Sequence, residues 1–356
     1  MRKILGYFIL LILFLPFPSL GNSSASRVGV GNEMPQTEQE KRDEMSEDIK
    51  HHTKDVHDFH IFSDKKENKH YGFPLPVILW DEGFHFFMSS EFHHGERTVP
   101  SKNNHFYKLS HDGKIYRTDA EGVKWMSTPL DLSITKNVLV TLVMAFLLFF
   151  LFKSVAKSYK TSLSPKGAAK FFEPLVLFVR DEIAIPNIGQ KHYKKYMVYL
   201  LSVFFFIWFL NLVGMTPFGV NVTGNIAVTF TLAIMTFIIT QTTANANYWK
   251  HIFWMPGVPT PMKVLLAPIE LLGVFIKPFA LMIRLYANML AGHIVIGSLI
   301  SLLFVFHNWG AKGAFLGLTL FLNIVELLVT FLQAYIFTML TALYFGFATE
   351  EHDDHH

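Results

Sequence analysis

The sequence contains no cysteine, which excludes disulfides, iron–sulfur clusters, thiolate metal sites and cysteine nucleophiles. Charge is scarce as well: 17% of the residues are charged and the formal net charge is +3. Such a balance provides no basic surface, so we expect no nucleic-acid partner. The chain also lacks a Gly-rich phosphate loop and a GxGxxG motif. Any nucleotide chemistry must therefore take place on another chain, and we expect no cofactor on this one.

Long uncharged runs dominate the second half of the chain, and 51% of all residues are hydrophobic. A soluble protein of 356 residues carries more charge than this, so the composition predicts a membrane protein. Five runs are near or above the length of one helical crossing. They cover residues 138–152, 197–214, 226–242, 263–306 and 314–347.

The last two runs are much longer than one crossing needs. As single helices they would measure roughly 65 and 50 Å at about 1.5 Å per residue, against about 30 Å of hydrocarbon. Helices of this length must tilt strongly, kink, or lie partly along the membrane plane. We therefore predict an all-α polytopic membrane protein with five transmembrane helices, in which the two C-terminal helices are long and strongly tilted.

The first 21 residues, 1–21, are typical of a secretory signal peptide. Two basic residues precede an apolar run of about 12 residues, and small residues near Gly21 suit cleavage. An uncleaved first transmembrane helix is the alternative, but about 12 apolar residues are too few to span a bilayer. Residues 22–60 are polar and charged, with few large apolar groups, so we expect a disordered exported segment.

Residues 61–133 show a different pattern, in which short apolar or alternating runs are separated by turn residues. The pair Asp112-Gly113 lies between two such runs and is a strong signal for a β-hairpin. We expect a small β-rich region on the exported side of the membrane, with no assignable chemistry. The runs are Pro76–Trp80, Phe84–Met88, His105–Leu109 and Lys114–Arg117.

Histidines are numerous in the exported region and at the C-terminus. Their spacing matches no ordered set of metal ligands, so we expect solvated surface histidines and no metal site. The clustered histidines are His51, His52, His57, His60, His93, His94, His352, His355 and His356.

The basic residues set the expected orientation. Nine Lys and Arg against three acidic residues lie between Lys153 and Lys195, so the positive-inside rule places this segment in the cytoplasm. Five crossings then leave the N-terminus outside, as a signal peptide requires, and the C-terminus inside, with residues 350–356 as a cytoplasmic tail. Within the same segment, residues 165–184 are expected to form an amphipathic helix on the inner membrane surface.

Four ionisable residues fall within the two longest runs: Glu270, Lys277, Arg284 and Glu326. An arginine at the middle of a bilayer costs at least about 2.5 kcal/mol, so such groups point to function. The first three are spaced by seven residues and therefore share one stripe of a helix. Small residues continue this stripe beyond Arg284, which would let another helix approach closely.

The polar residues of these two runs are expected to fall at matching levels. His293 lies roughly 13 Å along its helix from Arg284, and Glu326 lies roughly 10 Å from Gln333, at about 1.5 Å per residue. If the helices run antiparallel with Arg284 level with Gln333, His293 and Glu326 also meet near one level. Two titratable groups would then line a route from outside that ends at a fixed positive charge.

Two alternatives stay open at this point. Arg284 could pair with Glu326 or Glu270 in a buried ion pair that only holds helices together, although such pairs add little stability over apolar packing. His293 taken alone could be a satisfied core histidine, whereas its shared level with Glu326 favours a proton relay.

The segment from Arg284 to His293 reads RLYANMLAGH, and it resembles subunit a of F-type ATP synthases. The family pattern is Arg-Leu, then Asn-Met or Asn-Ile, then Ala-Gly followed by Glu or His. The last run, with Glu326 and Gln333, is similar to the second signature of the family. The resemblance covers about residues 134–352.

The resemblance implies a role for each polar residue of these segments. Arg284 would be the essential arginine that faces a carboxylate of a rotating c-ring. The outer half-channel would contain Asn288, His293, Glu326 and Gln333, whereas Glu270 and Lys277 would lie towards the inner one. The chain would translocate protons without being an enzyme by itself.

Two positions differ between members of the family. His293 stands where some bacterial members carry the acid, and Glu326 stands where they carry the histidine. Gly214 stands where many members carry an acid, so no role is carried over to it.

The resemblance also implies the partners and the location. The partners would be the c-ring, the b-subunit peripheral stalk, the rest of the F0F1 ATP synthase complex and the lipid bilayer of a bacterial inner membrane, with a periplasmic N-terminus. Two other classes compete. A secondary transporter would be expected to show inverted repeats, and none is visible between the halves. An exported binding or assembly protein would need only one membrane span.

Overall fold

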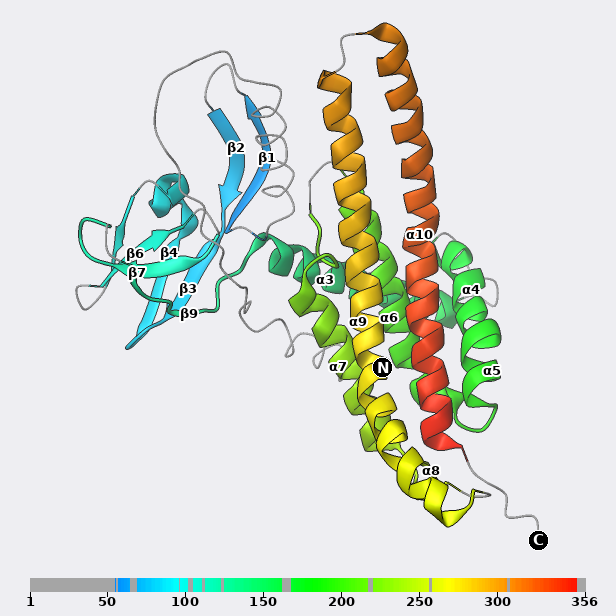
Figure 1. Cartoon of the computed structure of the whole chain (residues 1–356). Coiled ribbons are helices and arrows are strands. Elements are labelled where there is room, and N and C mark those ends of the chain that lie inside the picture. The colour runs from blue at the N-terminus through cyan, green and yellow to red at the C-terminus, as the bar shows by residue number, and fades with distance from the viewer. Residues whose placement is uncertain are drawn as a thin grey trace.

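The computed structural model of the chain consists of a bundle of long helices and a β-rich part beside it (Figure 1). The structure describes residues 55, 57–64, 69–95, 97–101, 105–110, 113–122, 125–161, 168–216, 220–255, 258–305 and 308–350. The predicted signal peptide, nearly all of the predicted disordered segment and the tail beyond Glu350 lie outside these residues.

Short antiparallel strands build the β-rich part, and three sheets are found among the described residues. β1 pairs with β2, the order β4-β3-β9 makes a second sheet, and β5-β6-β7-β8 makes a third. The strands are β1 (Asp58–Asp64), β2 (Lys69–Pro74), β3 (Pro76–Trp80), β4 (Phe84–Met88), β5 (Val99–Pro100), β6 (Phe106–Leu109), β7 (Ile115–Thr118), β8 (Trp125–Ser127) and β9 (Leu130–Asp131).

The strands confirm the runs that the sequence predicts for this region. β3 and β4 coincide with two of those runs, and β6 and β7 pair as an antiparallel hairpin. Gly113 in their connection has a φ of 83°, a left-handed conformation that glycine adopts at low cost. Alternate residues of β3 and β4 point inward, where Val77, Leu79 and Phe87 join a small core around Tyr107.

Five helices are long and apolar enough to cross a membrane, which confirms the polytopic class among the described residues. They are α3 (Lys136–Thr161), α6 (Tyr193–Gly214), α7 (Ile226–Thr243), α9 (Thr260–Val305) and α10 (Trp309–Thr349). The short helix α8 (Ala246–Phe253) connects α7 to α9. α3 continues well past the predicted end of its run, because Lys and Ser residues after it do not oppose helix formation.

The segment predicted as one helix over 165–184 is divided. α4 (Ala168–Phe178) passes into a π-helical turn, Val179–Ala184, and then into α5 (Ile185–Ile188). Pro186 has no backbone N–H and its ring crowds the carbonyl of Glu182, which favours a wider turn at this point. The segment has a buried apolar side, because Phe172, Val179 and Ile183 lie in the core of the helical part. Its place on a membrane surface remains a prediction.

Aromatic residues fill the core of the helical part. Phe204 and Phe205 of α6 are fully buried, and Tyr196 of the same helix stacks on Phe345 of α10 with ring centroids 4.4 Å apart. Gly346 lies directly against the backbone of Asn187 in α5. Glycine at this position therefore lets α10 approach α5 at backbone distance.

α9 and α10 form a long antiparallel hairpin that extends beyond the other helices (Figure 1). They contain 46 and 41 residues, which corresponds to about 69 and 62 Å at about 1.5 Å per residue. Both exceed the thickness of the hydrocarbon core, about 30 Å, by a factor of about two. Pro268 and Pro278 lie inside α9, where each removes one hydrogen bond and favours bending.

Candidate functional site

The α9–α10 hairpin carries all of the predicted polar site residues, from Glu270 to His293 on α9 and Glu326 and Gln333 on α10. The carboxyl group of Glu326 lies directly against Gly292. Since the helices run antiparallel, eight residues back along α9 and eight forward along α10 place Arg284 level with Ala334, beside Gln333. The Gly292–Glu326 contact agrees with the levels expected from spacing for His293 and Glu326. The nearness of Arg284 to Gln333 follows from counting residues along the two helices and stays a prediction.

His293 and Glu326 share a site between α6, α9 and α10. Nε2 of His293 would lie 3.6 Å from a Cβ placed on Gly214, at the end of α6. That nitrogen and Oε1 of Glu326 are buried, and neither has a hydrogen-bond partner among the described residues. Buried polar atoms in folded proteins are nearly always satisfied. Neither titratable atom is therefore satisfied by the part of the chain that the structure describes, which leaves each free to bond to water.

Arg284 is exposed on α9, one turn before the likewise exposed Asn288. Among the described residues, no carboxylate lies within the 4.0 Å that defines an ion pair with it. The alternative of a structural ion pair with Glu326 or Glu270 is therefore not observed. Arg284 therefore carries a permanent positive charge on an exposed face of α9.

Gln333 and Thr330 continue the site along α10. Both side chains are buried, and the Thr330 hydroxyl donates to Sδ of Met215 at 3.4 Å. Thr330 of α10 thus faces the end of α6.

Lys277 lies in a second polar site, nearer the opposite end of the hairpin. Its Nζ stands 5.8 Å from the ring centroid of Tyr344 and 5.5 Å from that of Phe347, in cation–π geometry. A small cavity between α7, α9 and α10 is lined by Lys277, Thr240, Gln241, Tyr248 and Tyr344 among others. Glu270 is half-buried and is not among the lining residues, so the structure does not bring it to this site.

Sequence reasoning missed Gln241 and Tyr248. Gln241 donates through Nε2 to the Tyr248 hydroxyl at 3.4 Å, while its Oε1 is buried without a hydrogen-bond partner in the described part of the chain. A signal was present, because Gln241 is a polar amide at the end of the third apolar run. Tyr248 gave none, since its place depends on the turn of α8 back towards the bundle.

The histidines of the β-rich part differ from the expectation of solvated side chains. His57 is only 4% exposed and bonds to Asp131 at 2.8 Å, so the prediction is wrong for this residue. His93 is exposed as expected. Within the described residues, no group of three or more His, Asp or Glu side chains could hold a metal ion. His51, His52 and the three C-terminal histidines lie outside those residues.

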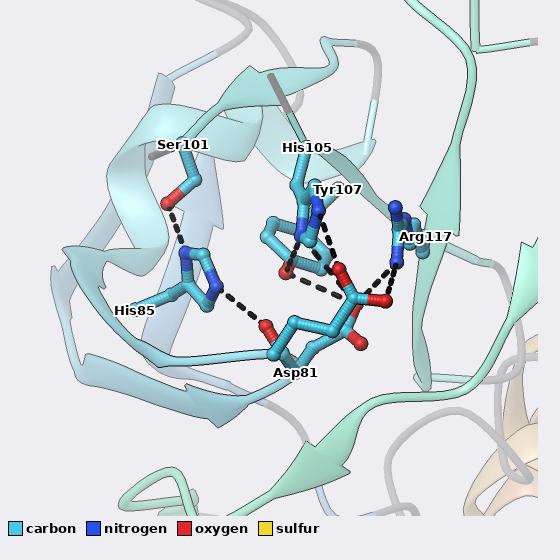
Figure 2. A network of polar contacts seen from close by, with 7 residues as sticks. Asp81, His85, Ser101, His105, Tyr107 and Arg117 are labelled. Atoms are coloured by element: carbon cyan, nitrogen blue, oxygen red, sulfur yellow. Dashed lines mark hydrogen bonds and ion pairs between the residues drawn. The ribbon is translucent and has the colours of Figure 1, made fainter. Parts of the chain in front are cut away.

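Two further buried histidines, His85 and His105, belong to the polar network of Figure 2. His85 donates through Nε2 to the carbonyl of Asp81 at 2.8 Å and accepts from the Ser101 hydroxyl at 2.7 Å. The Tyr107 hydroxyl donates to the Asp81 carboxylate at 3.2 Å, and burial together with that charge raises the pKa of Tyr107. The network is satisfied within the chain, which is typical of a structural role.

Comparison with known proteins separates the two parts of the chain. A family model described as ATP synthase A chain matches residues 137–346, and a model described as a domain of unknown function matches residues 48–132. The first match covers the helices that carry both polar sites.

Several curated proteins are similar to this chain. ATP synthase subunit a 2 of Chlorobaculum tepidum is 44% identical over 63% of this chain and 66% of its own length. ATP synthase subunit a of Myxococcus xanthus is 44% identical over 64% and 77%, and that of Chlorobium phaeobacteroides is 40% identical over 79% and 86%. The chain spans about two thirds of the length of the first of these relatives. The aligned region shared with the Chlorobium protein is longer than the membrane helices. It therefore includes some of the β-rich part.

Proposed function

The chain belongs to the ATP synthase A chain family, and we propose that it is the stationary proton-conducting subunit of an F-type ATP synthase. In this role it forms two half-channels against a rotating ring of c subunits and couples proton flow to ATP synthesis. The observation that carries the proposal is the exposed Arg284, which has no carboxylate partner among the described residues. It lies on the same hairpin as His293 and Glu326, each with a buried atom that no described group satisfies.

Arg284 acts as a fixed positive charge. A carboxylate on a ring subunit can face lipid only when it is neutral, because a bare charge in hydrocarbon is costly. A guanidinium stays protonated in proteins, so it attracts the ionised form of that carboxylate and forces the loss of its proton before it passes. The same charge prevents protons from moving straight between the two half-channels.

The outer half-channel uses Glu326 and His293, with Asn288 and Gln333 between them and the arginine. Both titratable groups have a buried atom that no group of the described chain satisfies, so each can exchange a proton with water or with its neighbour. Gly292 and Gly214 leave room for the two side chains between α6, α9 and α10.

The inner half-channel uses Lys277 and Glu270, and the cavity beside Lys277 adds Gln241 to it. The unsatisfied Oε1 of Gln241 offers a hydrogen-bond acceptor on this route. Protons leave the ring carboxylate here after a nearly complete rotation, so net flow requires turning of the ring. Each proton contributes about 2.3 kcal/mol per 100 mV, so several are needed for one ATP.

Location and partners follow from the same proposal. The chain lies in a bacterial inner membrane with its N-terminus in the periplasm and its C-terminus in the cytoplasm. A b-subunit stalk holds it against the turning ring, and the nucleotide chemistry takes place on the soluble part of the F0F1 complex. The chain is therefore not an enzyme by itself.

Glu326→Gln, introduced into the intact complex, tests the proposed outer route. ATP-driven proton uptake into inverted membrane vesicles should fall by about tenfold or more, as expected for the loss of a positioned proton-transfer group. Glu350→Gln is the matched control, because Glu350 is an exposed acid at the end of α10 and outside both routes. Unchanged proton uptake and an unchanged pH profile in Glu326→Gln would remove Glu326 from the relay.

A further inference from the structure

The sheet β4-β3-β9 carries an apolar face that nothing in the described chain covers. Its register pairs Ile78 with Phe86 and Trp80 with Phe84 on the outward side, and Leu130 lies beside Trp80 on the other edge. Phe86 is 63% exposed, and Trp80 and Phe84 are each 56% exposed. Every outward position of the three strands is an apolar residue. We call this surface, with Leu132, the outer sheet face.

An ordinary exported sheet presents polar residues to water and apolar residues to its core. Here the inward positions Val77, Leu79 and Phe87 already fill the core of the β-rich part. The charged and polar groups lie on that inner side as well, because His85 alternates with Phe84 and Phe86 and bonds to Asp81 and Ser101 (Figure 2). The polar groups of the sheet therefore lie on its inner side beside the core, and the outer side has none to face water.

The outer sheet face is joined to a membrane helix by a very short connection. The backbone N–H of Leu132 donates to Ile78, and that of Ile134 donates to Pro76, so the chain stays paired with β3 almost until α3 begins at Lys136. Lys136 is four positions after Leu132, which limits the distance between their Cα atoms to about 14 Å. The face therefore begins close to the membrane boundary of α3.

A second tie holds the β-rich part against the same side of the bundle. The carboxylate of Asp55 accepts hydrogen bonds from the Thr135 hydroxyl at 2.9 Å and from the backbone N–H of Asn137 at 3.1 Å. It also accepts from Nδ2 of Asn225, the N-cap of α7, at 3.5 Å. Residues at the starts of α3 and α7 thus both bind Asp55. These bonds limit how far the β-rich part can move away from the bilayer.

We propose that the outer sheet face lies on the membrane, in the headgroup–acyl boundary of the leaflet in which α3 begins. Aromatic side chains such as Trp80, Phe84 and Phe86 are suited to this boundary, and the absence of charge on the face removes the cost of bringing it there. The β-rich part then acts as a second anchor beside the helical bundle. This inference does not depend on the proton path.

The lack of cysteine in the chain allows a direct test in the full protein. Phe86→Cys places a spin label on the outer sheet face, and Leu130→Cys places a second one on its opposite edge. Ala120→Cys is the matched control, since Ala120 is an exposed residue of the β7–β8 turn. Each labelled protein is placed in a bilayer of phosphatidylethanolamine and phosphatidylglycerol. Relaxation by oxygen, which concentrates in lipid, is compared with relaxation by a water-soluble nickel chelate.

Labels at 86 and 130 should be accessible to oxygen and shielded from nickel, with an oxygen-to-nickel ratio several-fold above that at 120. Equal nickel accessibility at 86, 130 and 120 would mean that the face is open to water, and would overturn the proposal. Shielding of 86 and 130 from both reagents would overturn it as well, because a second copy or another protein would then cover the face.

Discussion

Gly292 shows how a single residue without a side chain can define a site. Glu326 occupies the space that a Cβ at this position would fill, and His293 follows directly in the chain. Both titratable groups reach the same region only because this residue and Gly214 remain small. Their positions depend on helix approach, which explains why polar spacing alone predicts their level but not their contacts.

Gly292→Ala should therefore impair proton transfer without removing any polar group. The new methyl group must displace the Glu326 carboxyl, at an overpacking cost of about 1–3 kcal/mol. ATP-driven proton uptake by the intact complex should fall, while the amount of assembled complex stays near that of the unmodified protein. Gly273→Ala on the same helix is the control, because its Cβ would meet no other atom within 4 Å. Equal activity of both variants would contradict a role for the Gly292–Glu326 contact.

At the scale of elements, α10 is fixed at its C-terminal end by several neighbours. Gly346 meets the backbone of α5, and Asn245 closes the end of the helix by donating its backbone N–H to Ala348 and its side-chain amide to Thr349. This end therefore serves as the fixed base from which the α9–α10 hairpin extends.

Gly346→Ala should loosen that base. Its Cβ would collide with the backbone carbonyl of Asn187, which cannot rotate away as a side chain can, so about 1–3 kcal/mol of unfolding free energy should be lost. Thermal unfolding of the full protein in lipid nanodiscs measures the effect. Gly317→Ala, with open space around its Cβ, should leave the midpoint unchanged or slightly raised. A midpoint for Gly346→Ala at or above that of Gly317→Ala would argue against the close approach.

The sequence predicts the elements of this fold well where local patterns determine them. The five apolar runs, the strands β3 and β4, and the hairpin at Gly113 all follow from hydrophobic periodicity and turn chemistry. The π-helical turn before Pro186 does not, because it depends on a shift of hydrogen bonds that no periodicity records.

Sites that depend on distant contacts are predicted less well. Arg284, His293 and Glu326 stand out because ionisable residues are rare in apolar runs. The pocket around Gln241 and Tyr248 requires α8 to fold back, and it could not be found from spacing. The burial of His57 was missed for the same reason, since its partner Asp131 is 74 residues away.

At the scale of the whole molecule, the His57–Asp131 pair connects the start of the β-rich part to the strand that leads into α3. Burial by itself raises the pKa of Asp131, but the hydrogen bond and charge of His57 and the bonds from Ser133 lower that pKa below its usual value. An acid with a lowered pKa stabilises the folded state above its unfolded value, about pH 4, and this contribution is lost as the pH falls through the folded pKa.

The connection between the two parts should therefore loosen in acid. Hydrogen exchange of the Leu132 and Ile134 amides, corrected for the intrinsic rate, should speed up between about pH 5 and pH 3. Asp131→Asn should exchange faster already at neutral pH and show little further change in acid. Glu121→Gln, at an exposed acid of the same part, should behave like the unmodified protein. Acid-independent protection in the unmodified protein would contradict this assignment.

The proposed function depends on the permanent positive charge of Arg284, which would attract a carboxylate of the rotating ring. Arg284→Ala tests it most directly. Proton pumping driven by ATP is measured in vesicles that contain the whole complex, with Arg180→Ala as the control, because Arg180 is a partly exposed arginine bonded to its neighbour Asp181. The account predicts that coupled pumping is abolished in Arg284→Ala and retained in Arg180→Ala. Coupled pumping that persists without Arg284 would contradict it.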